Sequence, residues 1–223
     1  MQSSTTCRRV GIWRVNNMEH VPQNEDFDWK DYYEQVVGDS HSRSLEKAVT
    51  TFCKEKGVAL DIGAGNLRDS KFLLNEGFTV IAIDPSPRSL EYAHALNNPS
   101  LELINDMVGG YNFPNNVFTL VNAQGILFHL PQPRFDDILQ KIKISLKSGG
   151  VFCGDFLGVN DDWNNSESKK TFLEKEQIEK IFDGFDIKVL KETENNSTYA
   201  ASVVNGTNDT KHWHWFKIIA VKK

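Results

Sequence analysis

The chain has 223 residues, of which 39% are hydrophobic and 25% are charged, and its formal net charge is −5. This composition fits a single globular α/β domain over residues 1–223, long enough to bury a substantial core. The acidic balance argues against a nucleic-acid partner, because binding to phosphates relies on a concentrated basic face. We therefore expect a small-molecule partner.

Cysteine usage and the apolar pattern predict a cytoplasmic location. The three cysteines are widely spaced and odd in number, which favours free thiols in a reducing compartment. No run of about 18 apolar residues occurs, and arginines interrupt the first twenty residues. We expect neither a membrane span nor a signal peptide.

The N-terminal part predicts an irregular tail over residues 1–24, followed by two helices. Apolar residues recur at helical spacing over 26–37 and 42–56, with Gly38-Asp39-Ser40 between them. These helices are either a plain layer on the sheet or a cover over a ligand.

Strands and helices then alternate. The predicted strands are 58–62, 78–84, 101–106, 118–123 and 151–156, and the predicted helices are 68–76, 89–96, 135–146 and 175–182. Alternation at this pace predicts a doubly wound, mostly parallel sheet. Residues 185–194 and 212–222 read as two further strands without a helix between them, so they can pair antiparallel.

The connection after the predicted strand 58–62 is a glycine turn suited to an adenosine. Gly63 and Gly65 let the backbone pass close to a ligand where a Cβ would collide. Asp84 lies 21 residues after Gly63, where a carboxylate can accept from both ribose hydroxyls. The alternative for Asp84 is the N-cap of the next helix.

The residue at the start of the next helix discriminates between adenosine cofactors. A dinucleotide fold has a third glycine three residues after the second, and this chain has Arg68 there. A guanidinium suits a carboxylate, which S-adenosylmethionine carries and NAD does not. Asp61 is expected to attract the methionyl ammonium. The turn therefore favours S-adenosylmethionine over NAD.

Here the chain resembles the class I S-adenosylmethionine-dependent methyltransferases, in particular the branch allied to the tellurite-resistance-type (TehB-like) enzymes. The motifs that carry the resemblance are Leu60-Asp61-Ile62-Gly63-Ala64-Gly65, Ala82-Ile83-Asp84-Pro85-Ser86, Leu146-Lys147-Ser148-Gly149-Gly150-Val151-Phe152, Trp29-Lys30-Asp31-Tyr32-Tyr33 and Lys211-His212-Trp213-His214. One departure is Leu67, where many relatives have glycine.

The resemblance implies a seven-stranded sheet with an antiparallel last strand and a helical lid over 25–56. It implies S-adenosylmethionine as cofactor and S-adenosylhomocysteine as product. The cofactor-binding residues predicted from the motifs and the strand ends together are Tyr33, Asp61, Gly63, Ala64, Gly65, Arg68, Asp84, Pro85, Asp106, Met107, Asn122 and Gln124. Asp106 and Met107 are assigned to the adenine, although Asn105-Asp106 reads equally as a loop pair. We expect a monomer or a homodimer.

No catalytic residue is identified by the pattern. The substrate-side candidates are Gln124, Phe128, His129 and Asp155. Each has a structural alternative, such as a turn histidine or a solvated loop acid. The segment after the fourth strand is not the Asn-Pro-Pro-aromatic motif used on flipped bases, which weakens base methylation.

A metal site is not predicted. His212 and His214 alternate on one strand, but no carboxylate or cysteine stands at ligand spacing around them in the sequence.

The predicted function is methyl transfer by in-line displacement to a small-molecule acceptor. An enzyme without a dedicated base suits a soft, anionic or metalloid acceptor. The alternatives are a catalytically silent protein that binds S-adenosylmethionine, and a nicotinamide oxidoreductase.

Overall fold

The computed structural model describes residues 14–15, 40–198 and 209–223. Within them, nine strands form one sheet in the order β1-β4-β3-β2-β5-β6-β9-β8, with β7 paired to β6 beside this path. The strands are β1 (Arg14–Val15), β2 (Val58–Ile62), β3 (Thr79–Ile83), β4 (Leu101–Asn105), β5 (Phe118–Ala123), β6 (Leu146–Gly158), β7 (Phe172–Leu173), β8 (Phe185–Thr198) and β9 (Thr210–Lys222). The helices are α2 (Arg43–Lys47), α3 (Arg68–Asn75), α4 (Pro87–Leu96), α5 (Gln132–Ser145) and α6 (Lys175–Ile181).

The prediction of a mostly parallel sheet with an antiparallel last strand is confirmed. Strands β4, β3, β2, β5 and β6 are parallel neighbours, and β9 lies antiparallel between β6 and β8. The number of strands along the path is eight rather than the predicted seven, because β1 pairs with β4. The expectation of an irregular tail over 1–24 is thus wrong at Arg14–Val15.

The predicted helix over 42–56 is shorter than expected. Helix α2 continues as a π-helical segment, η1 (Ala48–Phe52), and ends at Cys53. Val49-Thr50-Thr51 is a β-branched run with low helix propensity, and the Thr50 hydroxyl donates to the Glu46 carbonyl, which loosens the regular turn. The other predicted helix, 26–37, lies outside the described residues.

Helices cover both faces of the sheet. One face packs against α2, η1, α3 and α4 around small and branched side chains, including Ala59, Leu120 and Ala93. The opposite face packs against α5 and α6 around larger ones, including Phe135, Phe152 and Phe156. Burial on both faces explains why the parallel strands read as continuous apolar runs.

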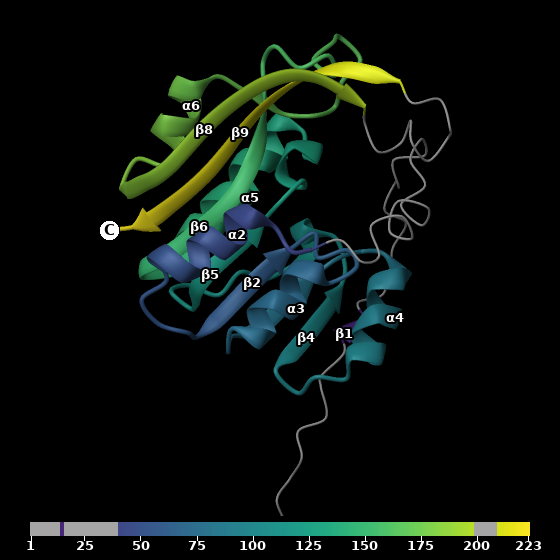
Figure 1. The fold of residues 1–223 in the computed structure, drawn as a ribbon, viewed down its shortest axis with the longest axis vertical. Coiled ribbons are helices and arrows are strands. Elements are labelled where there is room, and N and C mark those ends of the chain that lie inside the picture. The colour runs from purple at the N-terminus through teal and green to yellow at the C-terminus, as the bar shows by residue number, and fades with distance from the viewer. Residues whose placement is uncertain (1–13, 16–39, 199–208) are drawn as a thin grey trace, which may run out of the picture.

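Strands β6, β9 and β8 are longer than predicted and extend beyond the other strands (Figure 1). Pairing between β8 and β9 runs from Phe185 opposite Lys222 to Thr198 opposite Thr210. The polar segment after Leu190 lacks a strand pattern, and cross-strand pairing makes it extended. In Figure 1 these strands form an arch above the part of the sheet that contains β2 to β4.

No helix among the described residues has the length and apolar character that crossing a membrane requires. Of the three cysteines, the two that are described, Cys53 and Cys153, are free thiols.

Candidate cofactor and acceptor site

The turn between β2 and α3 depends on glycine at residue 63. Gly63 has a φ of +71°, and a Cβ built on it would lie 2.9 Å from the side chain of Ile126. The amides of Gly63 and Ala64 both donate to the carbonyl of Ile83, at 2.8 and 3.1 Å, so the turn is tied to the end of β3. Residue 63 is therefore required to be glycine by its backbone conformation and by its contact with Ile126, and its approach to a ligand stays a prediction.

The structure explains why leucine can replace glycine at residue 67. It caps α3 with a φ of +63°, and its side chain is fully buried. A left-handed backbone is costly for leucine, so burial of the side chain offsets the strain. Glycine adopts the same conformation without a packing contribution.

Asp84, after β3, is buried and organises the next turn. Its carboxylate accepts from the Gly65 amide at 2.9 Å, the Ser86 amide at 2.9 Å and the Ser89 hydroxyl at 2.6 Å. The N-cap of α4 is Ser86, whose hydroxyl accepts from the Arg88 amide. Asp84 is therefore not the N-cap, and it links the two turns that flank the predicted ribose position.

Asp61 and Asp69 form a buried carboxylate pair, with exposed fractions of 2% and 6%. The Asn122 side-chain amide donates to both, at 2.9 Å to Asp61 and 3.1 Å to Asp69. Asp61 also accepts from the Ser70 hydroxyl at 2.5 Å, and Asp69 accepts from the Ser42 amide at 2.8 Å. Among the described residues, every hydrogen-bond donor to this pair is uncharged.

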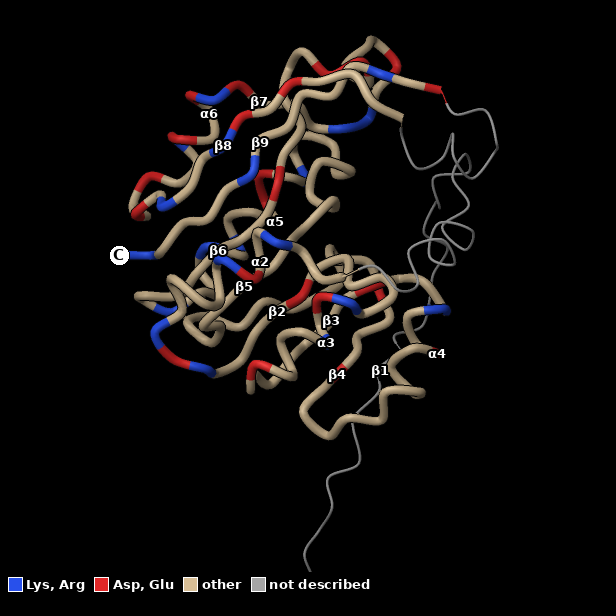
Figure 2. The backbone as a smooth tube through the Cα atoms, in the orientation of Figure 1, with Lys and Arg blue, Asp and Glu red and all other residues tan. Residues whose placement is uncertain are grey.

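The unbalanced charge alters the acidity of Asp61. Burial, followed by the nearby Asp69 carboxylate, raises the pKa of Asp61 to about 7. A cation at this point would lower the pKa again. Figure 2 shows acidic positions gathered where β2 and β3 end and α3 begins. The site has the charge that a cationic ligand requires.

Asp69 and Ser70 are functional candidates that the sequence analysis missed. They follow Arg68 in the first turn of α3, where the guanidinium alone had been assigned a role. A second aspartate eight residues after Asp61, at a helix start that faces the same strand end, was the available signal.

The remaining predicted cofactor residues lie around these turns. Arg68 is the first residue of α3, and its amide donates to the Asn66 side chain. Pro85 is exposed between β3 and α4. Asp106 and Met107 follow β4, and the Met107 amide donates to Asp106 at 2.7 Å. Tyr33, Trp29 and Tyr32 lie outside the described residues.

Asn105 and its neighbour Asp106 have different roles. Its buried side-chain amide donates to the carbonyls of Asp84 and Ser86, both at 2.9 Å. Asn105 thus holds the Asp84 turn, whereas Asp106 is half-buried in the loop after β4. The pair is not simply a loop pair.

Gln124 and Asp155 lie beyond the carboxylate pair. Asp61, Asn122 and Cys153 are neighbours in register, so their side chains share one face of the sheet, and Asp155 follows two residues later on that face. The Gln124 amide donates to Asn122 and Cys153, both at 3.3 Å. The Gly125 amide donates to Asp155 Oδ1 at 2.8 Å.

Asp155 is buried, with an exposed fraction of 7%. Burial raises the pKa of Asp155 to about 6, against the opposing effects of the Gly125 hydrogen bond and Lys217. Cys153 beside it is an unreactive thiol, because burial, followed by the charge of Asp155, raises its pKa far above the usual range.

Phe128 and His129 are in the 3₁₀ segment η3 (Leu127–His129) after β5. The Lys170 ammonium lies 3.3 Å from His129 Nδ1, and an ammonium can only donate, so Nδ1 accepts and Nε2 carries the proton of the neutral ring. Burial, followed by Lys170, lowers the pKa of His129 to about 3. His129 therefore has no free lone pair with which to act as a base.

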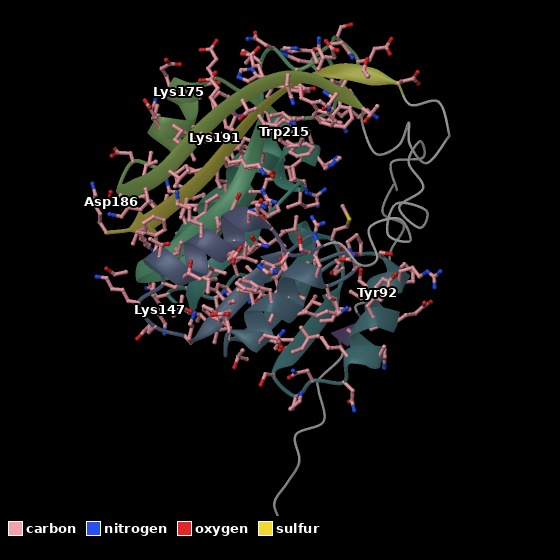
Figure 3. All side chains as sticks on the ribbon, in the orientation of Figure 1. Tyr92, Lys147, Lys175, Asp186, Lys191 and Trp215 are labelled. Carbon is pink, nitrogen blue, oxygen red and sulfur yellow. The ribbon has the colours of Figure 1, made fainter. Side chains whose placement is uncertain are left out.

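A cluster of aromatic side chains, here called the aromatic clamp, joins β9 to the loop after β6. It consists of Trp163, Trp213 and Trp215 with the buried Lys211–Asp161 ion pair. The Lys211 ammonium lies 4.3 Å from the ring centre of Trp163 and 3.8 Å from that of Trp213. Trp215, labelled in Figure 3, stacks on Trp213 at 5.0 Å and meets the edge of Phe128 at 5.3 Å.

Near His214 the structure brings together carboxylates that are distant in the sequence. Glu192 and Glu194 of β8 lie across from it, and their oxygens and His214 Nε2 are all within 4.8 Å of one another. The Asn160 amide donates to His214 Nδ1 at 3.1 Å, so Nε2 carries the proton and faces Glu192 at 3.0 Å. A protonated Nε2 is a hydrogen-bond donor and not a metal ligand, so this cluster is explained as a hydrogen-bonded contact.

Comparison with known proteins agrees with this geometry. Residues 59–150 match the family model described as "Methyltransferase domain". A search of the curated proteins finds no match.

The solved structures show the same fold. TehB from Haemophilus influenzae has a TM-score of 0.67 at 15% identity, covering 88% of this chain and 68% of that one. The 1,6-didemethyltoxoflavin-N1-methyltransferase from Burkholderia thailandensis, with bound 1,6-didemethyltoxoflavin and S-adenosylhomocysteine, has a TM-score of 0.59 at 16% identity, covering 86% and 84%. The phospholethanolamine N-methyltransferase 2 from Haemonchus contortus, in complex with phosphomonomethylethanolamine and S-adenosylhomocysteine, has a TM-score of 0.61 at 21% identity, covering 86% and 57%.

Residues 59–150 thus match a methyltransferase domain, and the chain has the fold of solved S-adenosylmethionine-dependent methyltransferases. The predicted doubly wound fold is therefore the one that these solved methyltransferases share.

Proposed function

We propose that this chain transfers the methyl group of S-adenosylmethionine to a small-molecule acceptor and releases S-adenosylhomocysteine. The observation that carries the proposal is the buried Asp61 and Asp69 pair, whose donors among the described residues are all uncharged. An ammonium or sulfonium placed beside this pair balances its charge. A dinucleotide, which brings phosphates, would add negative charge to it.

The proposed cofactor contacts follow the strand ends. Asp61 faces the methionyl ammonium, the 63–65 backbone lies under the amino-acid tail, and Arg68 holds the carboxylate. Asp84 accepts from the ribose, and Asp106 with Met107 borders the adenine. Asn122 is a positioning residue here, because its amide is already bonded to both carboxylates. Tyr33 stays a predicted cofactor contact.

The bound cofactor supplies an activated methyl group and its own leaving group. The work left for the protein is alignment and exclusion of water. The glycine turn and α3 fix one side of the reacting centre, and the Gly125 turn beside Asp155 fixes the other.

A small acceptor is supported by the net charge of −5 and by the molecules bound in two structures of the same fold. We extend the proposal to a single domain over 1–223, located in the cytoplasm, as a monomer or homodimer.

Calorimetry on the purified full chain tests the cofactor proposal. We expect heat with S-adenosylmethionine and with S-adenosylhomocysteine, and none with NAD. Because a ligand that binds the folded state raises its melting temperature, a thermal shift should rank the three in the same order. Absence of binding to both sulfur compounds would refute the proposed function.

A further inference from the structure

The space beyond the cofactor turn is bordered by one carboxylate with an unused oxygen. Asp155 Oδ1 accepts from the Gly125 amide at 2.8 Å, and no described residue donates to Oδ2. The side chain is more than nine-tenths buried, yet no described side-chain oxygen is fully buried without a partner, so Oδ2 reaches the surface of the site. A buried carboxylate with one fixed and one open oxygen is arranged to receive a proton or a donor.

The turn at Gly125, whose amide binds this carboxylate, is exposed and has open space beside it. A Cβ built on Gly125, whose φ is +68°, would meet no described atom within 4 Å. Gly125 directly follows Gln124, whose amide reaches Asn122 in the network of Asp61 and Asp69. The Gly125 turn is therefore linked through Gln124 to the residues of the proposed cofactor position.

An aromatic wall stands on the same face. Asp155 pairs with Lys217 and Leu157 pairs with Trp215, so Asp155 and Trp215 project from one face of the sheet, one two-residue step apart. Phe128 extends this wall, with its ring 5.3 Å from that of Trp215. Phe128 is buried and Trp215 is half-buried, so the indole presents part of its surface.

Lys217, opposite Asp155 in the register, is an exposed cation, and the other titratable groups near the wall are already committed. Lys211 is paired with Asp161 and enclosed by two indoles, and His129 Nδ1 is occupied by Lys170. Asp162 accepts from the His212 amide at 2.6 Å and so joins the loop after β6 to β9. Asp155 is the carboxylate that remains available on this face among the described residues.

We propose that the acceptor is a planar aromatic compound with an O–H or N–H nucleophile, that Phe128 and Trp215 border its ring, and that Asp155 accepts its proton. This inference depends on the proposed methyltransferase function. The bond from the acceptor oxygen or nitrogen to the methyl carbon forms as the sulfur–carbon bond breaks. The electron pair of that bond goes to sulfur, and the acceptor proton goes to Asp155 Oδ2. Atoms and charge balance without a further reagent.

This assignment replaces the expectation of an enzyme without a base. A thiolate or a metalloid anion already has a lone pair and needs neither Asp155 nor an aromatic wall. An aromatic hydroxyl or amine must lose a proton, and general-base catalysis typically contributes about 100- to 10,000-fold.

A binding experiment tests the aromatic wall without relying on turnover. The full chain is saturated with S-adenosylhomocysteine, and binding of catechol and 2-aminopyridine is compared with that of cyclohexanol and ethanolamine by saturation-transfer NMR. We expect the two aromatic probes to bind and Trp215→Leu to weaken them at least tenfold. Asp186→Asn, a change of an exposed carboxylate on β8, should leave binding unchanged. Absence of aromatic binding, or equal binding in Trp215→Leu, would overturn the proposal.

Turnover tests the base. Labelled methyl transfer is measured on a panel of aromatic hydroxyl and amino compounds, ethanolamine, 2-mercaptoethanol and selenite. We expect aromatic acceptors to be methylated and Asp155→Asn to lower kcat about 100-fold or more while the Kd for S-adenosylhomocysteine stays the same. The wild-type rate should rise with pH through an apparent pKa near 6 that the variant lacks.

The two levels of failure are separable. No heat with S-adenosylhomocysteine refutes the methyltransferase function itself. Heat with S-adenosylhomocysteine, together with methylation of selenite or the thiol at a rate that Asp155→Asn leaves unchanged, refutes the aromatic acceptor and the base alone.

Discussion

Two buried carboxylate sites at the same edge of the sheet have different kinds of hydrogen-bond partner. Asp61 and Asp69 receive hydrogen bonds from uncharged groups, whereas Asp161 in the arch is paired with Lys211 between two indole rings. Burial of a charge is costly unless it is paired, so the first group is incomplete without a cationic ligand and the second is complete by itself. The comparison separates a binding site from a structural clamp.

The largest expected effect is in the clamp. Asp161→Ala leaves the Lys211 ammonium buried without its partner, and loss of one member of a buried pair costs about 3 to 5 kcal/mol of unfolding free energy. Chemical denaturation measures this. The double change Asp161→Ala with Lys211→Met should regain part of the loss. If the single variant unfolds like the wild type, the clamp does not stabilise the arch.

At the proposed cofactor site, loss of a buried carboxylate should lower the affinity for the cofactor and not the stability of the fold. Asp61→Asn removes the charge that faces the ligand, and we expect the Kd for S-adenosylmethionine to rise about 100-fold. The ligand-free variant should be at least as stable as the wild type above pH 7, because repulsion with Asp69 is gone. Calorimetry and denaturation together check this, with Asp137→Asn on α5 as an exposed control. A marked loss of stability with unchanged affinity would reverse the assignment.

Removing one neutral donor sharpens the comparison further. Ser70→Ala deletes the hydroxyl that donates to Asp61 at 2.5 Å, and a hydrogen bond to a charged group contributes about 1.5 to 3 kcal/mol. The loss should be fully present at pH 8, where Asp61 is ionised, and smaller at pH 5. Equal destabilisation at both pH values would show that the Asp61 charge is not involved.

The smallest expected effect is the pH dependence of the wild type. Because the pKa of Asp61 is raised to about 7, the folded protein binds a proton that the unfolded chain has lost above about pH 4. This contribution to stability is complete below about pH 4 and is lost as the pH rises through 7. Affinity for S-adenosylmethionine should fall by up to about tenfold per pH unit below 7. Titration calorimetry at pH 6 and 8 measures it, and Asp61→Asn should abolish the dependence.

Local chemistry made much of the fold predictable. The segments 58–62 and 118–123 match β2 and β5 at both ends, because strands buried on both faces are mostly apolar and stand out from the polar turns around them. The glycines at 63 and 65 and the aspartates at 61 and 84 follow from turn geometry, and the structure places all four at one edge of the sheet.

Long-range pairing was less predictable. Glu192 and Glu194 are 20 or more residues from His214 in sequence, yet the β8–β9 register brings them within hydrogen-bonding reach. The same register places Trp215 on the face of Asp155. Neither contact has a signature in local spacing.

The sequence by itself determined the doubly wound fold and pointed to the class of enzyme and its cofactor, because the glycine turn, the carboxylates at the strand ends and the alternation of strand and helix depend on residues close in the chain. Tertiary structure alone decided which buried carboxylates have a positively charged partner. Whether a buried carboxylate meets serine, asparagine or lysine depends on neighbours from other strands, and that neighbour determines whether the site still requires a ligand.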